Sequence, residues 1–219
     1  MKLNVLNSNL SVLFFLLCHF CFSQTRQIDS TSISQNNDSI KKKYHVLKNV
    51  PKQYESTILG ALNYFPELEN TTIIFKKSHI KTTLNVRPTI GSILFKQRNR
   101  RTYVVRINNR IGDSAVTLLN VPFNAQLGLF AHEFCHIVDY NNRSFGGIIL
   151  RLLAYSNKKS KETYEKEIDS ETIKRGLGWQ LYYWAYFIMY QSNAKKRYKT
   201  YKKKFYLEPE EIATEIKKR

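Results

Sequence analysis

The chain has 219 residues, of which 42% are hydrophobic and 13% are aromatic. This length suits one ordinary domain with a tail, and the apolar content can build a core, which excludes a wholly disordered chain. The formal net charge of +18 comes from 35 lysine and arginine residues against 17 aspartate and glutamate residues. Such an excess favours an anionic partner, such as nucleic acid, lipid head groups or an acidic polymer.

Residues 1–23 have the pattern of a secretory signal peptide. Lys2 precedes the apolar run Leu10–Phe22, which is too short to span a bilayer because a spanning helix needs about 20 residues. Ser23 offers the small side chain that a cleavage site requires. The sequence therefore predicts an exported protein that resides in the periplasm, the cell envelope or the extracellular space.

Residues 24–45 differ sharply in composition from the rest of the chain, because polar side chains dominate and aliphatic ones are scarce. Such a segment buries too little apolar surface to offset the entropy lost on ordering, so it is predicted to be a flexible linker. A single folded domain is expected over 46–219.

Within that domain, the apolar pattern predicts a small sheet between helices. A first helix is expected at about 51–64, where Tyr54, Ile58 and Phe65 recur at helical spacing. Runs typical of strands come next, at Thr71–Phe75, Thr82–Val86, Ser92–Lys96 and Thr102–Ile111. Helical periodicity then covers about 124–140, 146–156, 161–175, 179–191 and 209–218. This order predicts an α+β fold.

The clearest strand is Thr102–Ile111, in which Tyr103, Val105 and Ile107 alternate with partly polar residues. Three arginines lie just before it, and this half-polar pattern favours an edge or solvent-facing strand. An edge strand can hold an extended peptide by main-chain hydrogen bonds, so this segment is the predicted substrate strand.

The most informative segment is the pentapeptide from His132 to His136. On a helix, residues four apart share a face, so the two histidines can direct ring nitrogens at one ion. Glu133 lies about 100° further round the helix, where it can accept a proton from water activated by that ion. Cys135 points away from both histidines and is expected to be a small core residue rather than a ligand.

The surroundings of this segment are strongly apolar, with Phe130, Phe134 and Val138 among its neighbours. Burying two histidines and a glutamate there is costly unless something pairs with them, and a divalent cation meets that requirement. The alternative is a helix with two core histidines that find ordinary hydrogen-bond partners.

A third ligand must come from elsewhere, and no histidine comes after His136 in the sequence. Glu165 and Asp169 lie four residues apart on a later helix, and Glu167 and Glu171 form a second such pair. A solvated, charged helix face is the non-functional reading of this segment.

The first pair, together with the histidine motif, resembles the gluzincins, a class of zincin peptidases whose second motif is Glu-x-x-x-Asp. The resemblance implies a zincin-like domain that binds Zn²⁺ through His132, His136 and Glu165. It also implies that Asp169 accepts a hydrogen bond from a ligand histidine and thereby orients its ring. More loosely, Ile173–Leu181 and Pro209–Ile212 are similar to a group of exported bacterial proteins of unassigned substrate.

Two later segments are less specific. Trp179–Tyr190 is rich in aromatic residues and suits a core helix or, second, a helix at a membrane interface. Lys195–Lys204 is strongly basic, which favours a solvated helix face or a contact with anionic lipid over nucleic-acid binding in an exported protein. Tyr182, Tyr183 and Arg175 are equal candidates for stabilising an oxyanion.

The sequence therefore predicts an exported zinc metallopeptidase acting on proteins or peptides, in which Glu133 is the general base. The alternative is a binding module with an inert zinc site that acts through its basic, aromatic C-terminal half on anionic lipid or polymer. Glu133 argues against that alternative, because a structural zinc site needs no base.

Overall fold

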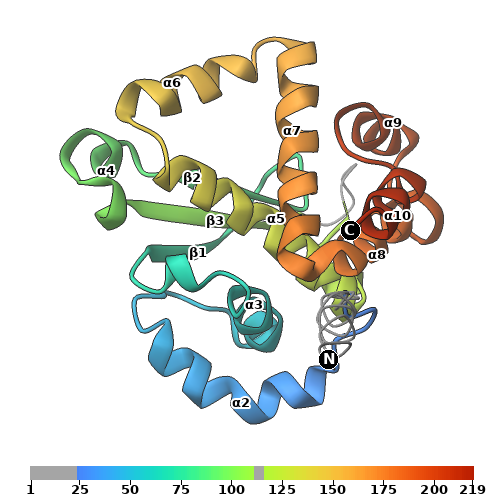
Figure 1. The fold of residues 1–219 in the computed structure, drawn as a ribbon, viewed down its shortest axis with the longest axis horizontal. Helices are drawn as coiled ribbons and strands as arrows, with labels where there is room; N and C mark the ends of the chain where they lie inside the picture. Colours follow the sequence, from blue (N-terminus) through green and yellow to red (C-terminus); the bar gives the residue numbers. More distant parts are fainter. Residues whose placement is uncertain (1–23, 111–115) are drawn as a thin grey trace, which may run out of the picture.

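The computed structural model describes residues 24–110 and 116–219, and the predicted signal peptide at 1–23 lies outside the described residues. The described chain is a mixed α+β domain in which one small sheet packs among helices (Figure 1), as the sequence predicts. None of the helices in these two ranges has the length and apolarity needed to cross a membrane.

The sheet has three strands, β1 (Thr72–Ser78), β2 (Leu84–Pro88) and β3 (Thr102–Asn108). Their order is β1-β3-β2, with β3 parallel to β1 and antiparallel to β2. The sequence predicts an edge or solvent-facing strand at Thr102–Ile111, but β3 is the central strand of the sheet, so the predicted edge position is wrong. An alternating pattern also suits a central strand whose sheet is covered on only one face, and here that face buries Tyr103 and Val105.

The segment predicted as a strand at Ser92–Lys96 is instead a short helix, α4 (Ile90–Phe95). A brief apolar run does not by itself distinguish a strand from a helix. Because β1 and β2 already occupy both sides of β3, a strand here would have no place beside the central strand. Ser92 joins α4 to the sheet, since its hydroxyl donates to the carbonyl oxygen of Thr102.

Helix α5 (Phe123–Asn141) lies at the centre of the fold and contacts β2 and the helices around it. Phe130 packs edge-to-face against Phe75 of β1, so the helix is fixed to the sheet by aromatic contacts. A Cβ on Gly128 would lie 2.2 Å from the carbonyl oxygen of Gln180, so only glycine permits the close approach of the later helix α8.

The C-terminal half is helical, as predicted. Its helices are α6 (Phe145–Ala154), α7 (Lys158–Thr172), α8 (Gly178–Tyr186), α9 (Lys196–Phe205) and α10 (Pro209–Lys217). Asn157 caps α7 by accepting the backbone N–H groups of Lys159 and Ser160. Gly176, at φ 84°, turns the chain between α7 and α8, so both helices can pack on α5.

The segment 24–45 is not the flexible linker that its composition predicts, because it contains helix α2 (Ser30–Lys43). This helix packs on α3 (Glu55–Leu62), which begins inside the helix predicted at 51–64. Ile33 is buried, and the Tyr44 hydroxyl donates to the Leu62 carbonyl oxygen, so few contacts suffice to order the segment.

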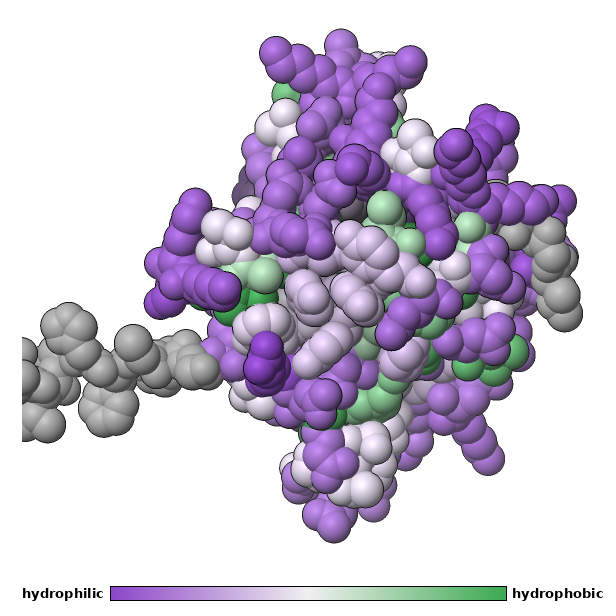
Figure 2. Space-filling model, turned by 90° about the vertical axis from the view of Figure 1, so that its right-hand side faces the viewer, coloured by the Kyte–Doolittle hydropathy of each residue, from purple (hydrophilic) through white to green (hydrophobic). Residues whose placement is uncertain are grey.

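Figure 2 shows the side of the molecule that carries α8, α9 and α10 in Figure 1, and this face is mostly hydrophilic around a paler centre. The segment Trp179–Tyr190 spans α8 and a π-helical turn, and it buries Leu181, Trp184 and Ile188. Its other side carries the partly exposed tyrosines Tyr186 and Tyr190, so it is a core helix with one solvated edge.

Candidate metal centre and cleft

The structure brings together His132 and His136 of α5 and Glu165 of α7. The Nε2 atoms of the two histidines lie 3.2 Å apart, and Glu165 Oε2 lies 3.3 Å from the first and 3.4 Å from the second. All three side chains are buried. Their ligand atoms fall within 4.8 Å of one another, which is close enough for all three to bind one metal ion.

The ring of His132 is oriented by Asp169, one turn after Glu165 on α7. His132 Nδ1 lies 2.8 Å from Asp169 Oδ1, and the other oxygen of this carboxylate accepts the backbone N–H of Leu207. Because the carboxylate accepts from Nδ1, the ring is oriented so that its Nε2 atom faces Glu165.

The ring of His136 is oriented by a different group. Its Nδ1 lies 3.1 Å from the hydroxyl of Tyr164, and that hydroxyl donates to Asp139 Oδ2. Burial raises the pKa of Asp139, but the hydrogen bond from Arg143 and the charges of Arg151 and Arg143 together outweigh it and hold the pKa below the ordinary value. The ionised carboxylate thus leaves the tyrosine oxygen free to accept from His136 Nδ1.

These contacts direct the Nε2 atoms of both rings and one carboxylate oxygen at the same point. Glu165 Oε2 is buried and faces the Nε2 atoms of both histidines at 3.3 and 3.4 Å, an arrangement that is costly unless the site holds positive charge. Burial lowers the pKa of His132, but Asp169 and Glu165 together raise it to about 10. The site therefore favours positive charge, and the donor set fits a divalent metal ion.

Glu133 lies beside this centre on the wall of an open cleft of about 880 Å³, to which His136 and Glu165 also contribute. The Glu133 carboxyl is buried, and its burial raises its pKa above the ordinary value. A carboxylate with a raised pKa is a stronger base near neutral pH, so Glu133 suits the role of proton acceptor.

The walls of the cleft are basic and aromatic. Apart from Glu133 and Glu165, its charged lining residues among those described are Lys76, Arg87, Arg106 and Lys161. Its tyrosines are Tyr140, Tyr155, Tyr201 and Tyr206. Burial, with the charge of Glu165, raises the pKa of Tyr155 and of Tyr206, so both hydroxyls stay protonated and can donate hydrogen bonds.

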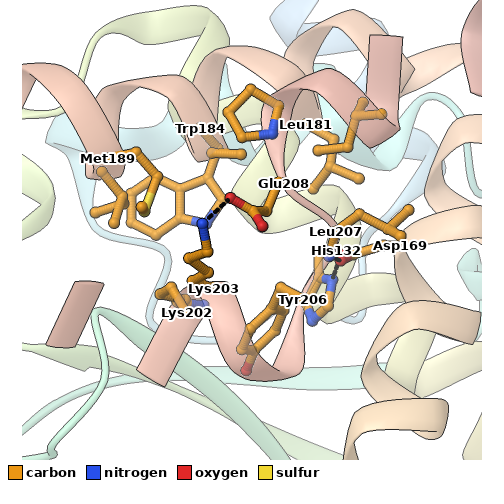
Figure 3. A pocket seen from close by; sticks show the side chains of 14 residues that line it. His132, Asp169, Leu181, Trp184, Met189, Lys202, Lys203, Tyr206, Leu207 and Glu208 are labelled. Carbon is orange, nitrogen blue, oxygen red and sulfur yellow. Dashed lines mark hydrogen bonds and ion pairs between the residues drawn. The ribbon is translucent and has the colours of Figure 1, made fainter. Parts of the chain in front are cut away.

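His132 lines a second, mostly apolar cavity (Figure 3). Trp184 and Met189 line it, and an ion pair of 3.1 Å between Lys203 and Glu208 lies among its walls. Tyr206 lines both this cavity and the cleft, and its ring centroid lies 5.5 Å from that of His132. The two hollows therefore share Tyr206 as a lining residue.

The competing candidates lie elsewhere. Glu167 is half-exposed and paired with Arg151, and Glu171 contacts Lys174 and Arg175 on the surface. Arg175 also pairs with Glu67. Neither Arg175 nor the tyrosines Tyr182 and Tyr183 line the cleft.

Cys135 is buried, as the sequence predicts for a core residue, and the Thr172 hydroxyl lies 3.4 Å from its sulfur. Burial raises the pKa of its thiol to about 12. A thiol in this environment has little thiolate at neutral pH, so it does not suit nucleophilic chemistry.

Sequence reasoning did not find Tyr164 and Asp139, which orient His136. Outer partners of ligand histidines are commonly carboxylates that contact the ring directly, so a tyrosine hydroxyl placed between the ring and the carboxylate is not expected. The one available signal is position: Tyr164 directly precedes Glu165, and Asp139 lies one helical turn after His136. Tyr155 and Tyr206 carry no spacing signal, because they reach the cleft from two different loops.

Comparisons with known protein families, with curated proteins and with solved structures find no match to this chain. Any functional assignment therefore rests on the geometry and chemistry of the centre and its cleft.

Proposed function

We propose that this chain is an exported zinc-dependent peptidase. The observation that carries the proposal is the buried group His132, His136 and Glu165, of which His136 and Glu165 line the same cleft as Glu133. Two histidines and one glutamate are a donor set typical of catalytic zinc, which keeps an open position for water. When bound there, zinc would polarise a carbonyl group and lower the pKa of water.

The chain's own residues account for the remaining steps. Glu133 accepts the proton from the attacking water and then delivers it to the nitrogen of the leaving amine. Tyr155 and Tyr206, whose hydroxyls stay protonated, are placed in the cleft to donate to the carbonyl oxygen as it becomes negative.

In this proposal β2, rather than the predicted segment Thr102–Ile111, is the strand that holds the substrate. Leu84 to Pro88 line the cleft, and their outer edge has no strand partner within the described residues. An extended peptide can pair with such an edge and run past Glu133. This placement favours a peptide over a small polar substrate.

The competing function is a binding module that acts through its basic, aromatic C-terminal half. Some basic and aromatic residues of that half already contact each other within the protein, since the Lys202 ammonium lies 3.6 Å from the centroid of the Tyr206 ring. A buried carboxylate at Glu133 also has no purpose in a module without catalysis, and burying it costs stability.

A peptide library tests the proposal. The purified protein should cleave members of the library, lose that activity when a chelator removes the metal, and regain it when zinc is added back. Cleavage that continues in metal-free protein, or a zinc-loaded protein that cleaves no peptide, would contradict the proposal.

A further inference from the structure

Helices α4 and α6 carry most of the large apolar side chains that the described residues expose. Ile90 is 77% exposed, Phe95 is 86% exposed and Leu150 is 68% exposed. The exposed apolar residues of the two helices, here called the α4–α6 face, are Ile90, Leu94, Phe95, Phe145, Ile149, Leu150, Leu152 and Leu153. A gathering of this kind marks an interaction site on a soluble domain.

The fold does not explain this exposure. In α6 only Ile148 is fully buried, while Arg151 holds the helix to the domain through Asp139 and Glu167. Elsewhere in the described chain, the exposed large apolar residues are Leu119, Tyr186 and Tyr190. The apolar exposure is therefore concentrated on the α4–α6 face.

The surroundings of the face are basic. Residues 76–110 and 140–161 contain lysine and arginine but no aspartate or glutamate. Exposed cations lie directly beside both helices, at Lys96, Arg98 and Arg100 after α4 and at Lys158 and Lys159 after α6. A partner must therefore accept apolar side chains and supply negative charge at the same time.

The two helices also flank one site. Both lie on the left-hand side of the molecule in Figure 1, away from α8, α9 and α10. Ile90 of α4 and Leu152 of α6 line the same cleft as Glu133. The mouth of that cleft thus opens beside the α4–α6 face.

We propose that the α4–α6 face docks the protein onto an anionic lipid surface, with its apolar side chains at the acyl boundary and its cations among the head groups. Interfacial helices combine apolar side chains with lysine and arginine in this way. A second copy of the chain fits poorly, because it would oppose cations with cations. Nucleic acid fits poorly because the exposed side chains are mainly aliphatic and cannot stack on bases.

The orientation on lipid also indicates the class of substrate, and this inference rests on the proposed peptidase function. With the face on lipid, the cleft mouth and the edge of β2 lie at the lipid surface. The substrates presented there are extended segments of proteins attached to that membrane.

Hydrogen–deuterium exchange of the full chain tests the docking without any measurement of hydrolysis. Vesicles of phosphatidylglycerol mixed with phosphatidylcholine should slow exchange in the peptides that contain α4 and α6, and vesicles of phosphatidylcholine alone should slow it much less. Slowed exchange confined to residues 1–23, or to α8 and α9, would overturn the proposal. Unchanged exchange in α4 and α6 would overturn it as well.

A triple variant and a control variant measure how much the apolar side chains of the α4–α6 face contribute to vesicle binding. Replacing Phe95, Leu150 and Leu153 by serine should weaken binding to the phosphatidylglycerol vesicles by roughly tenfold or more, because three apolar side chains lose their contact with lipid. The control Leu119→Ser removes an equally exposed leucine outside the face and should change binding less than about twofold. If the triple variant and the Leu119→Ser control weaken binding equally, the proposal is contradicted.

Sedimentation of the protein without vesicles tests whether the α4–α6 face binds a second copy of the chain. The wild-type chain should behave as a monomer, and a dimer that the triple variant abolishes would assign the face to self-association instead. Circular dichroism of the triple variant should match the wild type, because the replaced side chains are exposed. If that variant does not fold, the exchange experiment on the wild-type chain still decides.

Discussion

His132 and His136 lie one turn apart on α5, and both are buried, but they are held in different ways. His132 faces the apolar cavity, and its Nδ1 contacts the carboxylate of Asp169. His136 faces the open cleft, and its Nδ1 contacts the neutral hydroxyl of Tyr164. That hydroxyl in turn donates a hydrogen bond to Asp139. His132 is therefore held by a charged group, and His136 by a neutral hydroxyl that is itself hydrogen-bonded to a carboxylate.

In the proposed metal centre, this difference would divide two tasks between the histidines. A carboxylate raises the basicity of its histidine more than a hydroxyl does, so the His132 side would contribute more to the affinity for a metal ion. The His136 side shares the cleft with Glu133 and can contribute more to the placement of substrate. Substitutions on the two sides should therefore differ both in size and in kind.

The largest effect on zinc affinity is expected at Glu165, which both histidines face. Glu165→Gln removes the charge that both histidines face, so zinc affinity should fall by more than about 100-fold, beyond the loss typical of an outer partner. Glu167→Gln is the matched control, because Glu167 lies two residues away on α7 and pairs with Arg151. Zinc content measured by mass spectrometry should be lost only in the first variant.

A smaller loss is expected on the His132 side. Asp169→Asn leaves one oxygen to serve both His132 and the Leu207 amide, so one of these hydrogen bonds must be lost. Zinc affinity should fall by about 10- to 100-fold, as is usual for an outer carboxylate. A competition titration with a zinc chelator measures this value, and an unchanged affinity would show that Asp169 has no part in holding the ligand.

The loss on the His136 side should be smaller still. Tyr164→Phe removes the hydroxyl that contacts both His136 and Asp139, and the loss of the neutral hydrogen bond to His136 corresponds to about a 2- to 10-fold change in zinc affinity. The same titration should therefore rank Tyr164→Phe below Asp169→Asn. The reverse ranking would overturn the division of roles between the two histidines.

The mildest effect concerns the cleft that His136 faces. Lys76, Arg87 and Arg106 line it, so peptides with acidic residues should be cleaved faster than neutral ones at low salt. Arg87→Gln should reduce that preference by about 2- to 5-fold, because a partly exposed charge contributes little. Peptide cleavage at two salt concentrations measures it, and a preference that salt does not change would contradict an electrostatic origin.

The sequence identified the centre because its chemistry leaves a local pattern. The spacing of His132 and His136 on an apolar helix, and of Glu165 and Asp169 on a polar one, indicates shared faces without knowledge of the fold. The structure places these four residues together. That zinc occupies the centre stays a prediction.

The parts that the sequence did not predict depend on contacts between distant segments. The place of β3 in the sheet is set by its pairing with both β1 and β2, which its own alternation does not encode. Helix α2 is ordered by a few contacts such as those of Ile33 and Tyr44, although its composition is polar. Tyr164 acts through a hydroxyl whose partners come from another helix.

The central claim is that Glu133 is the base of a metal-dependent hydrolysis, and Glu133→Gln tests it most directly. The amide has nearly the same shape but cannot accept the proton, so peptide cleavage should fall by about 10²- to 10⁴-fold. Zinc content and circular dichroism, measured on the same sample, should match the wild type, since Glu133 is not one of the three grouped ligands. A variant that retains zinc and cleaves peptides at the wild-type rate would contradict the account.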